Sequence, residues 1–278
     1  MTSTWTYSYP FLSGSNSLPL GMFPLRGFSV RMVQTNGPTL GNDLFRAEEQ
    51  LANPPLLPFE VTTQTVMQVV NFADEGDGTT ASPFGYFPNA DAVPGLPPNS
   101  THDNIAVEIF AYLQLTAGGH RFGAVSDDGF QIRSGAGLRD TSATVMGVRD
   151  GGTFTGTFDF VVEATGLYPV RCIWYENGGT ANFQLFSVDP DNPAGRILLN
   201  DPTNPAGDVL VYQPIGVLSS ASVSGPYTAT AGALIDPVNQ TVTVPMSGSA
   251  QFYKMIAVNP VTLSNIHVVG SNVVFHYN

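Results

Sequence analysis

The chain has 278 residues, and its 22 acidic residues against ten lysines and arginines give a formal net charge of −12. Hydrophobic residues make up 42% of the chain and charged residues only 12%, so it can bury a core but must build its surface largely from uncharged polar residues. Lys254 is the single lysine, and the sequence shows no run of basic residues, which argues against nucleic acid or an anionic membrane as partners. No apolar run approaches the ~20 residues of a membrane-spanning helix, so membrane insertion is not expected.

The N-terminal segment is aromatic and free of charge, since the first charged residue is Arg26. From Thr4 to Leu12 aromatic and other residues alternate, with an aromatic ring at every second position from Trp5 to Phe11. A free tail of this kind would expose a large apolar patch to water. We therefore expect residues 1–25 to form an extended segment that pairs as a strand, on this molecule or on a neighbouring one.

Residues 26–200 are predicted to form a β-sandwich. One helix is expected at 39–52, because an apolar stripe runs along it until Pro54-Pro55, with Glu48 and Glu49 on its solvent face. A loop at 73–103 is long enough to suggest binding, and its acidic segment 74–77 is a candidate for a second cation site. Short strands separated by turn signals favour a sandwich over a parallel sheet. Strands are predicted at 27–34, 61–72, 106–116, 120–126, 130–134, 154–162, 168–175 and 182–188.

Turn-forming residues are dense at 189–208 and predict a boundary there. Residues 201–278 are therefore expected to form a smaller β-domain of the immunoglobulin-like kind. The single cysteine, Cys172, alternates with Val170 and Trp174 on one strand face, so it is expected to be a core residue and no intrachain disulfide is available. The fold class predicted for the whole chain is all-β.

The chemistry of the chain is concentrated at two places where strands end. Ser126-Asp127-Asp128-Gly129 lies between two predicted strands, and Glu176-Asn177-Gly178-Gly179 lies between two more, which we expect to form a hairpin. Oxygen ligands for a hard cation or for a sugar could gather there. The alternative is an ordinary tight turn, because Asp-Gly is a common turn dipeptide. No catalytic motif such as Gly-x-Ser-x-Gly is present, so no enzyme activity is expected.

The order Tyr-Leu-x-Leu-x-Ala-Gly-x-x-x-Phe-x-x-x-Ser-Asp-Asp-Gly runs from Tyr112 to Gly129, and Gly-Leu-Tyr-Pro-Val-Arg with Tyr-Glu-Asn-Gly-Gly-x-Ala follows between Gly166 and Ala181. These residues resemble the protective-antigen-type (PA-fourteen) β-sandwich family, which includes carbohydrate-binding and adhesive extracellular domains. The likeness covers residues 105–188. The C-terminal residues resemble β-modules of large secreted bacterial proteins.

In lectin members of that family, two consecutive aspartates joined by a cis peptide hold a calcium ion that also binds sugar hydroxyls. The resemblance implies that Asp127 and Asp128 are metal ligands, with Asn177 or Glu176 completing the shell. Because aromatic rings stack on sugar faces, Tyr175, Tyr86 and Phe87 are the candidates for the ligand-binding surface. After Ile132 the chain departs from the family pattern, with Ser134-Gly135-Ala136-Gly137 where the family often has Trp or Ile followed by Asp-Gly.

Two functions of different classes follow. The first is a non-enzymatic carbohydrate-binding or adhesion module, at the cell surface or outside the cell, that binds glycans or cell-surface polysaccharide with the help of calcium. The second is a structural subunit of an extracellular filament or surface layer, a homopolymer in which residues 1–24 complete the sheet of a neighbouring copy.

Overall fold

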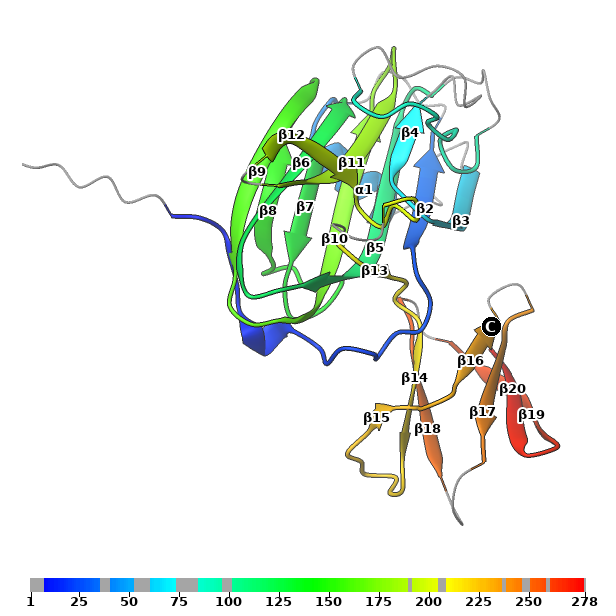
Figure 1. Cartoon of the computed structure of the whole chain (residues 1–278). Helices are drawn as coiled ribbons and strands as arrows, with labels where there is room; N and C mark the ends of the chain where they lie inside the picture. Colours follow the sequence, from blue (N-terminus) through cyan, green and yellow to red (C-terminus); the bar gives the residue numbers. More distant parts are fainter. Residues whose placement is uncertain are drawn as a thin grey trace, which may run out of the picture.

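The computed structural model describes residues 8–35, 41–52, 61–73, 85–96, 102–189, 192–204, 209–236, 239–246, 251–258 and 261–277. These residues form a larger and a smaller lobe, both built from β-strands (Figure 1). Within the described residues the one α-helix is α1, Leu44–Ala52, and a short 3-10 turn, η1, spans Gly14–Asn16. The all-β prediction is therefore confirmed.

The larger lobe consists of two sheets that face each other. Sheet A has the order β1-β9-β6-β11-β12, with β4 also paired to β11. Its strands are β1 (Phe11–Leu12), β4 (Asn71–Ala73), β6 (Gly118–Asp127), β9 (Phe154–Val162), β11 (Asn182–Asp189) and β12 (Asn192–Leu198).

Sheet B has the order β3-β2-β5-β10-β7-β8, and β13 also pairs with β5. Its strands are β2 (Phe28–Gln34), β3 (Val61–Met67), β5 (Ile105–Leu115), β7 (Phe130–Ser134), β8 (Thr144–Arg149), β10 (Gly166–Glu176) and β13 (Val211–Tyr212). β8 and β12 were not predicted from the sequence.

The core lies between the two sheets and is rich in aromatic rings. Trp174 of sheet B stacks on Phe183 of sheet A with ring centroids 5.6 Å apart, so one ring pair joins the two layers. Cys172 is buried beside them, as predicted, and burial raises the pKa of its thiol. Phe160 of β9 is also buried in this core.

Helix α1 covers the outer face of sheet B. The Asp43 side chain accepts a hydrogen bond from the Arg46 backbone N–H at 2.8 Å and so caps the helix start. Ala47 and Leu51 then face a second apolar cluster that includes Ile173. The helix was expected from residue 39; it begins at Leu44, and residues 36–40 lie outside the described residues.

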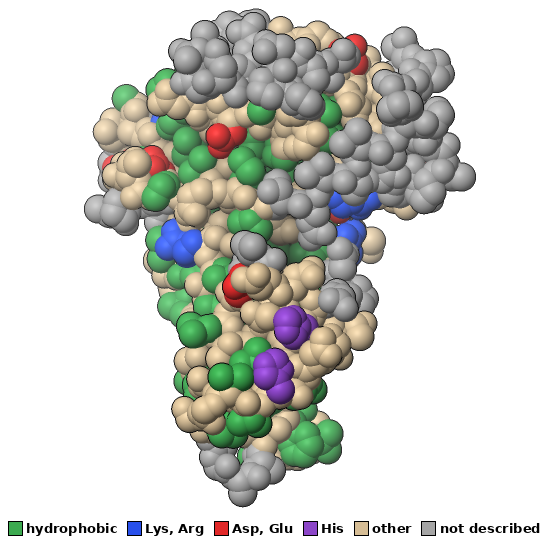
Figure 2. Space-filling model, turned by 90° about the vertical axis from the view of Figure 1, so that its right-hand side faces the viewer, with side chains coloured by type: hydrophobic (Ala, Val, Ile, Leu, Met, Phe, Trp, Pro, Cys, Tyr) green, Lys and Arg blue, Asp and Glu red, His purple; other side chains and the backbone are tan. Residues whose placement is uncertain are grey.

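The smaller lobe has its own core, in which Val217, Val242 and Phe275 are buried. Its two antiparallel sheets have the orders β15-β14-β18 and β16-β17-β20-β19. In the view of Figure 2, charged side chains lie mainly on the larger lobe, in line with a sequence that holds only Asp236 and Lys254 between residues 209 and 277. The strands are β14 (Gly216–Ser220), β15 (Thr228–Ala229), β16 (Leu234–Asp236), β17 (Thr241–Pro245), β18 (Phe252–Ile256), β19 (Leu263–Val269) and β20 (Asn272–Tyr277).

The observed strand pairs bear on the predicted domain boundary and on the predicted N-terminal segment. Because β13 adds to sheet B of the larger lobe, the pairing of that lobe extends to Tyr212, beyond the boundary predicted at residues 200 and 201. At the N-terminus, β1 runs parallel to β9 and Leu18 bridges to Leu167, so the described part of the segment pairs on its own molecule. The filament alternative therefore depends on residues 1–7, which lie outside the described residues.

Candidate metal centre

Two connections that cross between the sheets create the site. β6 belongs to sheet A and β7 to sheet B, so Asp127-Asp128-Gly129 links the two layers and is not the tip of a hairpin. β10 belongs to sheet B and β11 to sheet A, so the hairpin predicted around Glu176-Asn177-Gly178-Gly179 is also wrong. The two crossings lie side by side, which brings their polar residues together.

Backbone hydrogen bonds lock the two crossings against each other. The Asp128 N–H donates to the Tyr175 carbonyl at 3.1 Å, and the Tyr175 N–H donates to the Gly129 carbonyl at 3.1 Å. The Trp174 indole N–H donates to the Asp127 carbonyl at 3.0 Å. The Asn177 N–H donates to Asp128 Oδ2 at 3.0 Å. The peptide bond between Asp127 and Asp128 is cis, as the family resemblance implied.

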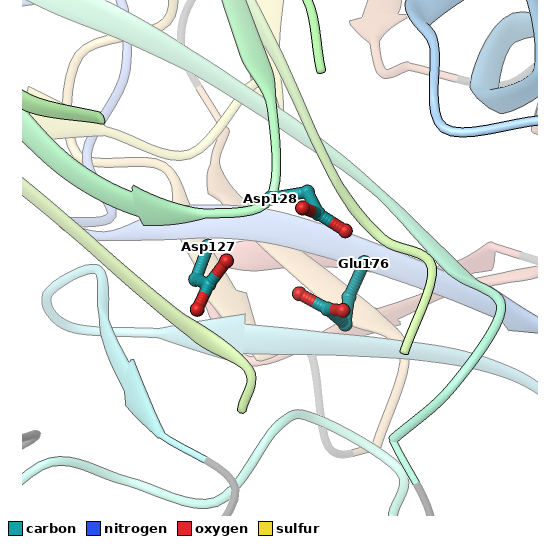
Figure 3. A group of neighbouring side chains, drawn as sticks. All are labelled: Asp127, Asp128 and Glu176. Carbon is teal, nitrogen blue, oxygen red and sulfur yellow. The ribbon is translucent and has the colours of Figure 1, made fainter. Parts of the chain in front are cut away.

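Three carboxyl groups converge here. Among the described residues, Asp127, Asp128 and Glu176 form the one group of three acidic, histidine or cysteine side chains whose ligand atoms all lie within 4.8 Å of one another. Figure 3 shows them directed toward a common space, with Asp127 at the end of β6, Asp128 directly after it and Glu176 at the end of β10. We call this group the acidic cluster. Asp127 is half-buried and Asp128 and Glu176 are buried, so the cluster opens to solvent on the Asp127 side.

Such convergence is unfavourable without a positive charge. Burial, followed by the repulsion from Asp128 and Asp127, raises the pKa of Glu176 to about 9. The folded protein without a cation therefore keeps a proton on Glu176 at neutral pH. A cation bound at the cluster would take the place of that proton.

Buried polar atoms without hydrogen-bond partners also indicate that the cluster is suited to a cation. Glu176 Oε2 and Asn177 Oδ1 are buried and have no hydrogen-bond partner among the described residues. Glu176 Oε1 does have one, the Gly178 N–H at 2.6 Å. Unpaired buried oxygens are costly, and those here belong to the group types that hard cations prefer. The donor set is therefore chemically suited to calcium.

A buried arginine supports the cluster from α1. The Arg46 guanidinium donates to the Glu176 carbonyl at 3.3 Å, to the Ile105 carbonyl at 3.1 Å and to Gln50 Oε1 at 2.7 Å. It also lies over the Tyr175 ring, 5.4 Å from the centroid. Desolvation lowers the pKa of Arg46, opposed by Tyr175 and nearby carboxylates. Arg46 thus fixes the end of β10, where Glu176 begins the crossing.

The aromatic residues predicted to stack on a sugar lie away from the cluster opening. Tyr175 is fully buried, and its hydroxyl donates to Asp150 Oδ1 at 2.8 Å, so its ring is not available to a ligand. Tyr86 is 44% exposed, but it contacts Phe186 edge-on and carries the Arg196 guanidinium 4.0 Å from its ring centroid. Phe87 packs on the same Phe186. Phe186 is four residues along β11 from the crossing, roughly 13 Å.

Asn182 is the residue that sequence reasoning missed. It is the first residue of β11 and pairs with Asp127 in the register of β11 and β6, so the two side chains share one face of sheet A. It is fully buried, and neither atom of its amide has a hydrogen-bond partner among the described residues. The signal was a polar residue three positions after Gly179, at the start of the next predicted strand, but its pairing with Asp127 becomes visible only once the crossing is known.

The acidic segment at 74–77, predicted as a second cation site, lies outside the described residues. No helix in the described part of the chain is long and apolar enough to cross a membrane.

No protein-family model matches the sequence. No curated protein matches it either. Among solved structures, the PA14 domain of the antifreeze protein MpAFP aligns with 68% of this chain and 91% of its own, at 18% identity and a TM-score of 0.42.

Two further solved structures are similar over a comparable range. The PA14 sugar-binding domain from an RTX adhesin covers 63% of this chain and 96% of its own, at 15% identity and a TM-score of 0.43. The Epithelial Adhesin 9 A domain from Candida glabrata, in complex with Galβ1-4GlcNAc, covers 70% of this chain and 99% of its own, at 10% identity and a TM-score of 0.45.

Proposed function

We propose that the chain is a non-enzymatic, extracellular glycan-binding or adhesion module whose sugar site is organised by calcium at the acidic cluster. The observation that carries this proposal is the convergence of Asp127, Asp128 and Glu176 within 4.8 Å, beside buried oxygens that have no partner. Asp127, Asp128 and Asn177 would supply side-chain ligands, and Glu176 would approach the ion once its proton is released. Asn182, from the facing strand, joins this set.

Calcium is favoured over other metals by the kind of donor. The candidate ligands are carboxylate and amide oxygens, and neither histidine nor cysteine contributes to the cluster. Zinc and copper prefer nitrogen and sulfur ligands, whereas calcium takes six to eight oxygens in a flexible arrangement. Calcium sites of extracellular modules often have dissociation constants of about 10⁻⁴–10⁻³ M, so the titration should start in that range.

The sugar half of the proposal rests on the resemblance of residues 105–188 to a family with carbohydrate-binding members, and on the opening of the cluster. Asp127 is the half-exposed member, so a calcium ion there would keep ligand positions on the solvent side. Vicinal hydroxyls of a sugar could occupy such positions, because they are neutral oxygen donors at a short fixed spacing. Calcium would then link protein and glycan.

The metal is tested first, by calorimetric titration of CaCl₂ into metal-stripped protein. We expect saturable binding to the wild type and no measurable binding to Asp128→Asn. Glu49→Gln is the matched control, since it removes one negative charge from an exposed position of α1 and should titrate like the wild type. Equal binding by all three proteins would remove the acidic cluster as the site.

The glycan is tested next, on an array that includes Galβ1-4GlcNAc, with calcium and after its removal. We expect glycan signals that require calcium and that disappear in Asp128→Asn. Signals that persist unchanged in metal-free buffer would separate sugar binding from the cluster. Calcium binding without any glycan signal would reduce the proposal to a structural cation site.

A further inference from the structure

A pocket of about 320 Å³ lies on the outer face of sheet B, beside the C-terminal end of α1. It is distinct from the acidic cluster, since Arg171, which lines the pocket, lies five residues before Glu176 on β10, roughly 17 Å along the strand. The other lining residues used below are Glu48, Glu108, Arg133, Arg139 and Asp140.

Three of the nine arginines of the chain line this pocket, and a fourth, Arg31, joins them through Glu108, although the protein as a whole is strongly acidic. Arg171 and Arg133 are direct partners in the register of β10 and β7, a like-charge pairing that is unfavourable by itself. Arg31 pairs with Glu108 in the register of β2 and β5. Arg139 reaches the pocket from the turn between β7 and β8. These arginine side chains therefore lie together on the outer face of sheet B, in a chain that has few charged residues.

Two glutamates hold these arginines in place. Glu108 is fully buried and accepts from Arg171 at 2.6 Å, while its contacts to Arg139, at 3.4 Å, and Arg31, at 3.5 Å, are long. Glu48, from α1, accepts two bonds from Arg171 at 2.8 Å each and one from Arg133 at 3.2 Å. The expectation that Glu48 lies on a solvated helix face is therefore wrong, because it ties α1 to sheet B.

The charges at the pocket do not cancel. The network of ion pairs around the pocket consists of Arg31, Arg133, Arg139 and Arg171 with Glu48 and Glu108, and Asp140 lies beside it, so four positive and three negative charges leave one positive charge. The Asp140 carboxylate is engaged by its own turn, where it accepts from the Ala136 N–H, the Ser142 N–H and the Ser142 hydroxyl. Arg139 is the weakly held cation, because its side chain is half exposed and only the long contacts to Glu108 hold it. Its guanidinium lies 4.8 Å from the centroid of the Phe110 ring, which positions it over the sheet.

We propose that this arginine pocket binds a monoanion, the carboxylate or sulfate group of an acidic sugar. One negative charge would neutralise the excess, and guanidinium groups bind such planar or tetrahedral oxyanions through paired N–H donors. The volume lies within the range of small-molecule sites and suits one sugar ring. The identity of the ligand as a sugar rests on the proposed function, whereas the anion site itself depends only on the arginines.

The test is calorimetric titration with glucuronate in buffer stripped of metal on a resin, since soluble chelators are themselves polycarboxylates. We expect the wild type to bind glucuronate but not glucose, and inorganic sulfate to compete for the site. Arg139→Gln should weaken glucuronate binding at least tenfold. Lys254→Gln, which removes one positive charge from an exposed position of the smaller lobe, should bind like the wild type.

Thr141→Glu guards against a folding defect in the first variant, because it adds a negative charge at an exposed lining residue and leaves the arginine network intact. It should also abolish binding. Asp128→Asn should bind glucuronate normally, so a failure of the calcium proposal and a failure of the anion pocket are distinguishable. The pocket proposal is overturned if the wild type ignores glucuronate, if Arg139→Gln or Thr141→Glu binds like the wild type, or if Lys254→Gln weakens binding equally.

Discussion

Asn182 lies opposite Asp127 in the register of β11 and β6, fully buried and with both amide atoms unpaired among the described residues. An unsatisfied buried amide costs about 1–3 kcal/mol, which a fold keeps only where something else offsets it. Asn182 lies beside three converging carboxyl groups, and a ligand role there would offset that cost. Its amide oxygen would be a further ligand for the cation proposed at the acidic cluster.

Asn182→Ala should therefore separate stability from metal binding. Without calcium, the free energy of unfolding should stay within about 1 kcal/mol of the wild type, because removal of the unsatisfied amide offsets the cavity that the truncation leaves. Calcium affinity should fall roughly tenfold, about 1.4 kcal/mol. Urea unfolding with and without calcium measures both quantities.

The matched control is Asn71→Ala on the neighbouring strand β4. The Asn71 amide is also buried, but it donates to the Pro88 carbonyl at 3.1 Å and accepts from Gln184 Nε2 at 2.7 Å. Its loss should cost about 1–3 kcal/mol with or without calcium. Similar profiles for the two variants would contradict a metal role for Asn182.

The raised pKa of Glu176 predicts a pH dependence. The ordinary value is 4.5 and the folded value about 9, so between these limits the folded metal-free protein keeps a proton that the unfolded chain has lost. The contribution of this group is full below pH 4.5, and it is lost as pH rises toward 9, with a slope of at most about 1.4 kcal/mol per pH unit. Metal-free Glu176→Gln should therefore match the wild type at pH 4 and be the more stable protein at pH 8.

Denaturant unfolding of both proteins across this pH range measures the difference. Calcium at pH 8 should stabilise the wild type more than Glu176→Gln, because only the wild type has a third carboxylate to neutralise. Parallel stability curves for the two metal-free proteins would show that Glu176 is not protonated in the fold.

The local sequence pattern predicted many of the strands, but it did not predict to which of the two sheets each strand belongs. Alternation correctly placed Val170, Cys172 and Trp174 on the core-facing side of one strand, because side-chain period depends only on the strand itself. A turn between two strands has the same sequence signal whether it closes a hairpin or crosses between sheets. For that reason both connections at the site were predicted as hairpins, although each links β-strands of different sheets.

The same distinction explains the site. Asp127 and Asp128 were found because they are adjacent in sequence, and Glu176 because it ends a recognisable strand. Asn182 and the arginines at 31, 133, 139 and 171 were missed because only the register of distant strands brings them together. Tyr175 was misjudged, since the helix that buries it lies 130 residues away in the chain.

Arg46 should contribute more to stability than an ordinary surface arginine. It is buried and donates to three carbonyls, of Gly41, Ile105 and Glu176, and to the side chain of Gln50. Hydrogen bonds to charged groups contribute about 1.5–3 kcal/mol each, and they are not additive. We expect Arg46→Gln to lower the free energy of unfolding by about 3 kcal/mol and to weaken calcium binding as the end of β10 loosens.

Arg121→Gln is the comparison for this prediction. Arg121 forms a bidentate pair with Asp159 at 2.7 and 2.9 Å, but both side chains are about one-third exposed. Exposed pairs contribute about 0–1 kcal/mol, so this variant should be close to the wild type in urea unfolding and in calcium titration. Equal losses of unfolding free energy and of calcium affinity in the two variants would contradict a special role for Arg46.

Gly129 is the residue that lets the two crossings approach each other. A Cβ added there would lie 2.3 Å from the Tyr175 hydroxyl oxygen and 2.7 Å from the Arg149 carbonyl oxygen, and the second of these is backbone that cannot rotate away. Gly129→Ala should therefore push the Asp127-Asp128 connection off β10, with a loss of about 1–3 kcal/mol in the free energy of unfolding and a clear loss of calcium affinity. Gly119→Ala, at the opposite end of β6 and with no atom within 4 Å of the added Cβ, should change stability by less than about 0.5 kcal/mol and leave calcium binding intact. Because both variants add one methyl group, a calcium affinity that is unchanged in Gly129→Ala would mean that the packing of β7 against β10 does not position the cluster.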